Sequence, residues 1–437
     1  MKVYIKTLGC EKNTVDSENA MALLEETGAV QTQDPGEADV IIVNTCGFIH
    51  DAKQQSIETI FDRIREKKEG QKLIVTGCLS QRYAEQLAGD IPEVDVFLGV
   101  NDYPALQDVV RDMDLSRIIA NKAGKEYEEL PRKFSGSVSA SLKIAEGCNN
   151  ICTYCAIPYI RGLYRSRRPE YILAEARDLA KQGVEELVII AQDVTGYGRD
   201  FGREDMLPQL LRDLCAISGI RWIRLMYCYE DEITPELIRV IREEPKICKY
   251  LDIPIQHSSD SILKAMNRRS TEQSIRSTIQ ELRKQIPDIV IRTTLITGFP
   301  GESKEDFQNL LDFVADMKFD RLGVFPYSKE EGTAAARMKP QIRKDVKERR
   351  ADRIMALQQR ISLENNQKYI GKTLEVLVEE VLPDGSYSGR SAYDAPEIDD
   401  GVLFTGPAGI QPGTFVPVTI TDAFDYDLSG VCYEPAK

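Results

Sequence analysis

The sequence predicts an α/β multidomain protein with three parts: an open parallel α/β domain, a partial (βα)6 barrel and a small antiparallel β-barrel. Strand and helix patterns alternate along residues 1–120 and again, over a longer stretch, along residues 134–366. Residues 367–437 are instead rich in Val, Thr, Gly and Pro, with short strand patterns between turns. A chain of 437 residues has room for several domains, each with its own hydrophobic core.

The first part alternates short apolar strands with helices. Its expected elements are strands at residues 2–8, 40–43 and 73–75 and helices at residues 16–27 and 56–68. This order predicts a flavodoxin- or Rossmann-like parallel sheet with crossover helices. Residues 121–133 lack periodicity and contain Pro131, so we interpret them as a linker.

The second part contains six further strand patterns separated by helical ones. The expected strands lie at residues 142–145, 186–191, 222–227, 250–255, 289–296 and 321–325. Six βα units predict a barrel or partial barrel whose loops, at the C-terminal ends of the strands, carry the site. A long charged helix at residues 343–369 follows, and strands near 374–379 and 415–420 predict the closing β-barrel.

Composition excludes several classes of protein. No apolar run is long enough to span a membrane, and residues 1–6 lack the apolar core of a signal peptide, so we expect a cytoplasmic protein without a membrane partner. Lys and Arg number 56 and Asp and Glu number 70, which gives a net charge of −14. Such a chain is a poor nonspecific binder of nucleic acid and is better suited to a basic partner. The two histidines, His50 and His257, leave little scope for histidine-rich metal sites.

The strongest chemical signal is the CxxxCxxC motif of Cys148, Cys152 and Cys155, which follows the expected strand at 142–145. Three thiolates at this spacing can hold three irons of a 4Fe–4S cluster and leave the fourth iron open for a small molecule. A structural zinc site would need four ligands, and no fourth Cys or His lies nearby in the sequence. The motif therefore predicts an iron–sulfur cluster rather than a zinc knuckle.

A second group of cysteines is spread along the first part of the chain. Cys10, Cys46 and Cys78 each stand beside a glycine at the end of an expected parallel strand. The C-terminal ends of parallel strands share one edge of a sheet, where open α/β folds bind ligands. Buried apolar cysteines are common, but three in register favour a second cluster with one free iron. We interpret the remaining cysteines as structural; they are Cys215, Cys228, Cys248 and Cys432.

The CxxxCxxC motif, with the aromatic Tyr154 before its third cysteine, resembles that of the radical S-adenosylmethionine (SAM) enzymes. With the second triad, essentially the whole chain resembles the methylthiotransferase branch of that family. The resemblance implies an N-terminal methylthiotransferase domain, a radical SAM core and a C-terminal TRAM barrel. It also implies two 4Fe–4S clusters and two SAM molecules, of which one supplies a methyl group and the other a radical that opens a substrate C–H bond.

Three stretches resemble the RimO branch, whose substrate is the β-carbon of an aspartate in the twelfth protein of the small ribosomal subunit. They are residues 143–148, 251–257 and 394–399. Residues 371–437 hold three basic and twelve acidic side chains, and this charge favours a basic ribosomal protein over a phosphate backbone. A solvated acidic surface is the plainer explanation of that charge. Two alternatives are methylthiolation of a modified adenosine in tRNA and a non-catalytic iron–sulfur, RNA-binding module.

The resemblance implies further partners and cofactor contacts. The partners are an electron donor, such as flavodoxin or ferredoxin, and a sulfur donor. No catalytic side chain is assigned beyond the cluster ligands. The expected SAM contacts, all in or near strand-end loops, are Tyr154, Gln192, Gln256 and Gly298. Turn or capping roles explain Gln192, Gln256 and Gly298 equally well. His257, beside Gln256, is explained equally well as a structural residue.

Four arginines follow the cluster loop, and two uses are open for them. They could hold an acidic substrate side chain or form a solvated basic face. They are Arg161, Arg165, Arg167 and Arg168.

Overall fold

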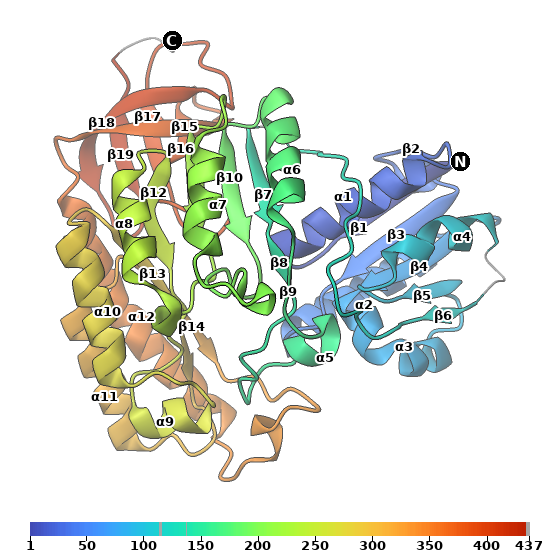
Figure 1. Ribbon diagram of the computed structural model, residues 1–437, viewed down its shortest axis with the longest axis horizontal. Helices are drawn as coiled ribbons and strands as arrows, with labels where there is room; N and C mark the ends of the chain where they lie inside the picture. The colour runs from blue at the N-terminus through green and yellow to red at the C-terminus, as the bar shows by residue number, and fades with distance from the viewer. Residues whose placement is uncertain (113–115, 137, 434–437) are drawn as a thin grey trace.

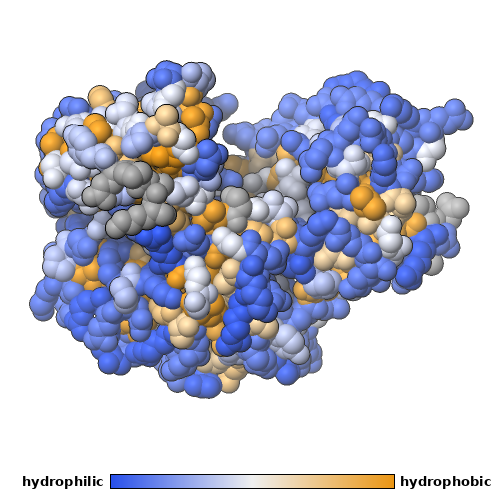
Figure 2. Space-filling view, turned by 90° about the horizontal axis from the view of Figure 1, so that it is seen from above, coloured by the Kyte–Doolittle hydropathy of each residue, from blue (hydrophilic) through white to orange (hydrophobic). Residues whose placement is uncertain are grey.

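The computed structural model describes residues 1–112, 116–136 and 138–433, and its main elements form two parallel sheets and a closed barrel (Figure 1). This arrangement confirms the predicted fold class. The boundaries expected at residues 120, 134 and 366 stay predictions. In the described part of the chain, no helix has both the length and the apolar character needed to cross a membrane. The face seen from above in Figure 2 is mainly hydrophilic, with hydrophobic side chains in small patches.

The N-terminal domain is a six-stranded parallel sheet in the order β2-β1-β3-β4-β5-β6. Its strands are β1 (Lys2–Thr7), β2 (Val30–Gln31), β3 (Val40–Thr45), β4 (Lys72–Gly77), β5 (Val96–Leu98) and β6 (Ile118–Ile119). Its helices are α1 (Glu11–Glu25), α2 (His50–Glu66), α3 (Cys78–Asp90) and α4 (Leu106–Arg111). Apolar clusters cover both faces of the sheet.

Helix α1 begins five residues before the helix expected at residues 16–27. Its first turns carry the polar side chains of Lys12, Asn13 and Asp16, which are nevertheless buried. These side chains face the central domain rather than solvent, so the helix lacks the apolar stripe that usually reveals an amphipathic helix. Val15 of α1 belongs to an apolar cluster that includes Ile190 and Met226 of the central domain.

The central domain is a six-stranded parallel sheet in the order β14-β13-β12-β11-β10-β7. Its strands are β7 (Ser139–Lys143), β10 (Glu186–Ile190), β11 (Trp222–Leu225), β12 (Ile247–Asp252), β13 (Val290–Thr297) and β14 (Arg321–Pro326). Its main helices are α6 (Pro169–Lys181), α7 (Met206–Cys215), α8 (Pro235–Glu243), α10 (Glu272–Gln285), α11 (Lys304–Met317) and α12 (Lys344–Gln367). The largest apolar core lies between the sheet and these helices.

Short elements connect the central strands near the site. They are β8 (Ala145–Glu146), α5 (Ile157–Arg161), β9 (Arg165–Ser166) and α9 (Asp260–Ala265). The strand expected at residues 142–145 is therefore divided, because β7 ends at Lys143 and β8 pairs with β9 in a separate two-stranded sheet. This division turns the chain out of the main sheet just before Cys148.

The C-terminal domain is a closed barrel in the order β15-β16-β17-β19-β18. Its strands are β15 (Thr373–Val381), β16 (Tyr387–Ser391), β17 (Val402–Thr405), β18 (Phe415–Ala423) and β19 (Leu428–Val431). The pair β17–β19 is parallel, whereas an antiparallel barrel was expected. Strand β19 closes the barrel by lying between β17 and β18, and it runs parallel to β17 and antiparallel to β18.

Part of the acidic charge of the barrel is internal, which corrects the charge argument made from composition. Asp394 forms an ion pair with Arg321 at 2.8 Å, and Asp399 forms one with Arg292 at 3.4 Å. Both acidic residues belong to the 394–399 stretch, and both are buried against the central domain. Arg221 of that domain also pairs with Glu375. The two buried carboxylates, Asp394 and Asp399, dock the barrel onto the core and are unavailable to a basic partner, whereas Glu375 stays exposed.

Candidate functional site

The three N-terminal cysteines meet at the C-terminal edge of the first sheet. Cys10 caps α1 after β1, Cys46 follows β3, and Cys78 follows β4 as the first residue of α3. Because β1, β3 and β4 are adjacent strands, their ends lie side by side. A Cβ atom on Gly9 would lie 2.9 Å from that of Cys46, so only glycine fits at this turn, where φ is +93°.

The three thiols of this triad differ in solvent exposure. Cys10 is exposed, Cys46 is half-buried and Cys78 is buried. Burial raises the pKa of Cys46 to about 11. Burial also raises the pKa of Cys78, although the nearby guanidinium of Arg161 opposes that rise. The triad is thus open on the Cys10 side and closed on the Cys78 side.

The central triad lies on the loop between β8 and α5. The backbone N–H of Asn150 donates to Cys148 Sγ and that of Ile157 to Cys155 Sγ, each at 3.4 Å. Burial raises the pKa of Cys148 to about 12 and that of Cys155 further. Such buried thiols lose their protons when iron binds, and N–H···S bonds of this kind are one means by which proteins tune clusters.

The donor sets fit iron–sulfur clusters better than single metal ions. Among the described cysteines no disulfide forms, so both triads offer thiols. No group of three Cys, His, Asp or Glu side chains in residues 1–112, 116–136 and 138–433 converges closely enough to hold one ion. The thiolates of a cluster each bind a different iron and therefore stand farther apart. We take the triads as candidate cluster sites because each offers three thiols, and thiolates are the usual ligands of iron–sulfur clusters.

The expected SAM contacts lie at strand ends of the central domain, with differing surroundings. Gln192 follows β10 and donates its amide to Glu146, which leaves Gln192 Oε1 buried and unpaired. Gln256 follows β12 in a left-handed conformation, with φ at +68°. The N–H of Gly298 donates to Glu302 at 2.6 Å. Tyr154 packs against the apolar cluster around Phe299.

His257 has the surroundings of a structural residue. Its side chain is fully buried, and its Nδ1 accepts a hydrogen bond from the N–H of Ser259 at 2.9 Å. Its Nε2 lies 3.7 Å from a carboxylate oxygen of Glu302. Nε2 is buried without a hydrogen-bond partner among the described residues, and Glu302 in turn binds the N–H groups of Gly298 and Phe299.

Three of the four arginines after the cluster loop differ from both expectations. Arg161, Arg165 and Arg167 are buried and bound by protein groups, so the structure contradicts both a substrate-holding and a solvated role for them. Arg168 alone is exposed, with its nearest carboxylate, that of Glu126, at 3.9 Å. Arg161 connects the central domain to α1 and Arg167 connects it to the linker, whereas Arg165 binds only backbone carbonyls among the described residues.

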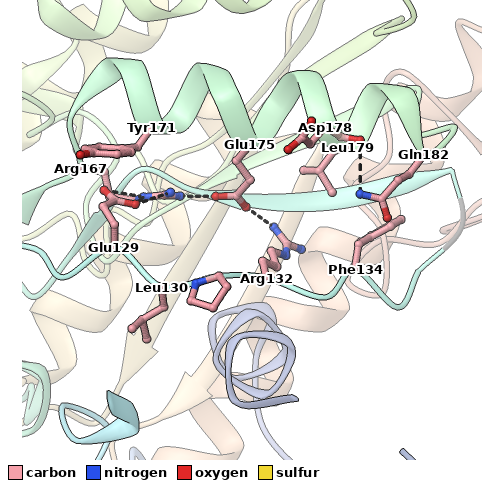
Figure 3. A pocket seen from close by; sticks show the side chains of 11 residues that line it. Glu129, Leu130, Arg132, Phe134, Arg167, Tyr171, Glu175, Asp178, Leu179 and Gln182 are labelled. Carbon is pink, nitrogen blue, oxygen red and sulfur yellow. Dashed lines mark hydrogen bonds and ion pairs between the residues drawn. The ribbon is translucent and has the colours of Figure 1, made fainter. Parts of the chain in front are cut away.

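Figure 3 shows one such use, where the predicted linker crosses α6. Arg167 pairs with Glu129 of the linker and with Glu175 of α6, each at 2.6 Å. Arg132 pairs with the same Glu175 at 2.7 Å. Beyond the side chains drawn in the figure, Arg132 also pairs with Glu18 of α1 at 2.7 Å. The linker is thereby fixed between the N-terminal and central domains.

A buried ionic network joins the two triads. Lys143 and Arg161 both pair with Asp16 of α1 and with Glu146 of β8. Although burial opposes it, these two cations hold the pKa of Glu146 well below its usual range. Arg161 Nη2 also lies 3.4 Å from Cys78 Sγ. Sequence reasoning missed this network, because Asp16 and Lys143 are 127 positions apart.

Two tyrosines after β11 lie between the triads and were also missed. The Tyr229 hydroxyl shares a hydrogen bond with Cys152 Sγ at 3.2 Å. The Tyr227 hydroxyl donates to Glu11, the residue after Cys10, at 3.1 Å. Tyr227 has a φ of +57°, which is unusual for a bulky residue and typical of functional sites. Two tyrosines at the end of the strand expected at residues 222–227 were the sequence signal that could have revealed this part of the site.

A loop after β14 touches both cysteine groups. Glu330 accepts from Lys53 of α2 at 2.6 Å and from Arg82 of α3 at 3.0 Å. Arg82 also donates to the carbonyl of Gly47, the neighbour of Cys46, at 3.1 Å. In the same loop, the N–H of Ala335 donates to the carbonyl of Thr153 in the central triad at 2.8 Å.

Two triads on a parallel α/β scaffold, one of them CxxxCxxC, define a radical SAM protein. Three family models match the chain: uncharacterized protein family UPF0004 over residues 2–99, the radical SAM superfamily over residues 142–314 and the TRAM domain over residues 370–432. Radical SAM membership implies SAM and a 4Fe–4S cluster as cofactors.

Curated relatives identify the branch. The chain is 49% identical to "Ribosomal protein uS12 methylthiotransferase RimO" of Clostridioides difficile, with all of both chains covered. It is 50% identical to the protein of that name from Desulforamulus reducens, with 98% of both chains covered. This chain therefore belongs to the RimO family of methylthiotransferases.

Solved structures share the fold at low identity. The radical SAM methyltransferase TsrM from Kitasatospora setae gives a TM-score of 0.57 at 13% identity, with 74% of this chain and 72% of that chain covered. The cobalamin-dependent radical enzyme OxsB gives a TM-score of 0.52 at 13% identity, with 77% and 54% covered. These likenesses concern the fold alone.

Proposed function

We propose that this chain attaches a methylthio group to the β-carbon of an aspartate in ribosomal protein uS12. Its relatives bear the name of that activity over their full length. The observation that carries the proposal is contact between the surroundings of the two triads: Arg161 lies 3.4 Å from Cys78, and Ala156, which follows Cys155, shares an apolar cluster with Cys78. Between them lie the start of α1 and the segment from Tyr227 to Tyr229. A sulfur site and a radical site must both reach one substrate carbon, and this arrangement suits that need.

The proposal assigns a 4Fe–4S cluster to each triad. Cys148, Cys152 and Cys155 hold the first, with SAM beside it in contact with the strand-end residues Tyr154, Gln192, Gln256 and Gly298. Cys10, Cys46 and Cys78 hold the second. When bound, the first cluster and SAM supply a 5′-deoxyadenosyl radical, and the second cluster holds the sulfur to be transferred.

The protein's own groups orient and shield these sites. Two backbone N–H groups and the Tyr229 hydroxyl bind the sulfur atoms of the central triad. The network of Lys143, Arg161, Asp16 and Glu146 fixes the separation of the two triads. Burial of this ionic network also lowers the local dielectric, which strengthens the electrostatic interactions that orient the two sites.

The substrate and accessory partners are also part of the proposal. The chain's net charge of −14 suits a basic ribosomal protein, even after the carboxylates that dock the barrel are set aside. Turnover also requires an electron donor, such as flavodoxin or ferredoxin, and a sulfur donor.

The test is anaerobic turnover of the cluster-loaded protein with uS12, SAM, sulfide and a reductant. We expect uS12 to gain a methylthio group on an aspartate, detected by peptide mass spectrometry. Unmodified uS12 with both clusters full would contradict the proposal. Methylthio-adenosine in a parallel incubation with tRNA would move the substrate to nucleic acid.

A further inference from the structure

We propose that Lys12, beside Tyr227 and two residues after Cys10, binds the carboxylate of the substrate side chain. This inference rests on the proposed function, which makes that side chain an aspartate. It makes Lys12 the residue that selects an acidic side chain over an uncharged one.

The first observation is a buried cation without a counter-ion. Lys12 is only 6% exposed, and its ammonium nitrogen lies 3.3 Å from the centre of the Tyr227 ring. Within the described part of the chain, this cation–π contact is its one side-chain interaction. Lysines are rarely buried without a paired acid, because removing the charge from water is costly.

Lys143 provides the contrast within the same molecule. Lys143 is also buried, but its ammonium pairs with Asp16 and Glu146. The carboxylate nearest in sequence to Lys12, that of Glu11, accepts the Tyr227 hydroxyl and forms no ion pair with Lys12. The charge of Lys12 therefore remains available for a ligand.

The second observation is the position of this charge. Lys12 lies in the first turn of the 15-residue helix α1, two residues after Cys10, and the Cys10 cap gives no side-chain hydrogen bond to that turn. The positive end of a helix favours an anion at the same place. Tyr227, which holds the ammonium, is two residues before Tyr229, the partner of Cys152. A carboxylate on Lys12 would thus lie between the two triads.

The consequence is discrimination by charge. A carboxylate on the ammonium forms a charge-assisted hydrogen bond in surroundings that are largely dry. An uncharged amide in its place leaves the buried cation uncompensated. Loss of one partner from such a pair costs about 1.5–3 kcal/mol, which is about tenfold to a hundredfold in affinity.

The experiment measures binding without turnover. Cluster-loaded protein with SAM and no reductant is titrated with uS12 and with uS12 whose target aspartate is replaced by asparagine. We expect the wild type to bind the aspartate form about tenfold or more tightly than the asparagine form. Lys12→Met should lose this preference, Lys12→Arg should keep most of it, and Lys6→Met, at an exposed lysine of the same domain, should leave it unchanged.

Two results would overturn the inference. One is a wild-type protein that binds both forms of uS12 equally, which needs no variant and does not depend on folding. The other is a Lys12→Met protein, with wild-type iron content and melting temperature, that retains the full preference. Failure of the proposed function is a separate outcome, in which wild-type protein prefers the aspartate form but makes no methylthio product.

Discussion

The guanidinium Nη2 of Arg161 lies 3.4 Å from the Sγ of Cys78, although the two residues belong to different domains. Arg161 ends α5, the helix that follows the central triad, and it also donates to Asn13 of α1 at 2.8 Å. One side chain therefore connects the loop of the central triad to a ligand of the N-terminal triad. The electrostatic environment of the N-terminal triad is therefore set partly by Arg161, a residue of the central domain.

A positive charge that donates to a cluster sulfur raises the cluster's reduction potential. We expect Arg161→Gln to lower the midpoint potential of the N-terminal cluster and Arg161→Lys to lower it less. The measurement is a redox titration followed by electron paramagnetic resonance, in protein that lacks Cys148, Cys152 and Cys155. Arg132→Gln is the control, because Arg132 also bridges the domains but contacts Glu18, Glu175, a backbone carbonyl and the Phe134 ring rather than a cysteine. An equal shift of the midpoint potential in Arg161→Gln and Arg132→Gln would show that lost contact between the domains causes the shift, rather than the lost charge beside Cys78.

The two triads should separate functionally. Cys152→Ala removes a ligand of the proposed SAM-binding cluster, so we expect it to abolish formation of 5′-deoxyadenosine. Cys46→Ala should leave that cleavage largely intact and stop transfer of sulfur to the substrate. Both products are measured in one anaerobic assay by chromatography and mass spectrometry. A fully active Cys46→Ala protein would refute the second cluster, and a wild type that never forms 5′-deoxyadenosine would indicate a non-catalytic module.

The contact of Glu330 with Lys53 and Arg82 should hold the N-terminal cysteines in place. Glu330→Gln removes the buried negative charge between two cations. We expect faster hydrogen exchange in α2 and at the start of α3, and faster loss of iron from the N-terminal site. Glu331→Gln is the matched control, because Glu331 is the exposed neighbour. Unchanged exchange in the Glu330 variant would show that other contacts carry the interface.

The ion pair of Asp394 with Arg321 should stabilise the docked barrel rather than bind substrate. Asp394→Asn leaves Arg321 buried without its counter-ion, which costs about 3–5 kcal/mol of unfolding free energy. Chemical denaturation checks this value, with the exposed Asp422→Asn as control. Loss of uS12 binding without loss of stability would instead place Asp394 in the substrate surface.

The fold was predictable because its signals are local. Apolar strands, crossover helices and the CxxxCxxC spacing are each contained in a short stretch of sequence. The start of α1 was missed because its polar residues are buried by another domain, which reverses the usual meaning of a polar face. Composition overstated the acidic surface of the barrel, since Asp394 and Asp399 face arginines far away in sequence.

The candidate site was predictable in part for the same reason. The six cysteines stand in recognisable motifs, whereas Lys12 is conspicuous only once it is seen to be buried without a paired acid among the described residues. Arg161 likewise acquires a role only through Asn13, from which it is separated by 148 positions. Pairing over such distances is a property of the packed structure, and no spacing in the sequence indicates it.

The most direct test of the central claim is mass spectrometry on cells that lack this gene and on the same cells with the gene restored. Ribosomal protein uS12 and total tRNA nucleosides are analysed from each culture. The account predicts a methylthio group on an aspartate of uS12 that is present only when the gene is present, with tRNA nucleosides unchanged. A gene-dependent methylthio group on adenosine, with uS12 unmodified in both cultures, would contradict it.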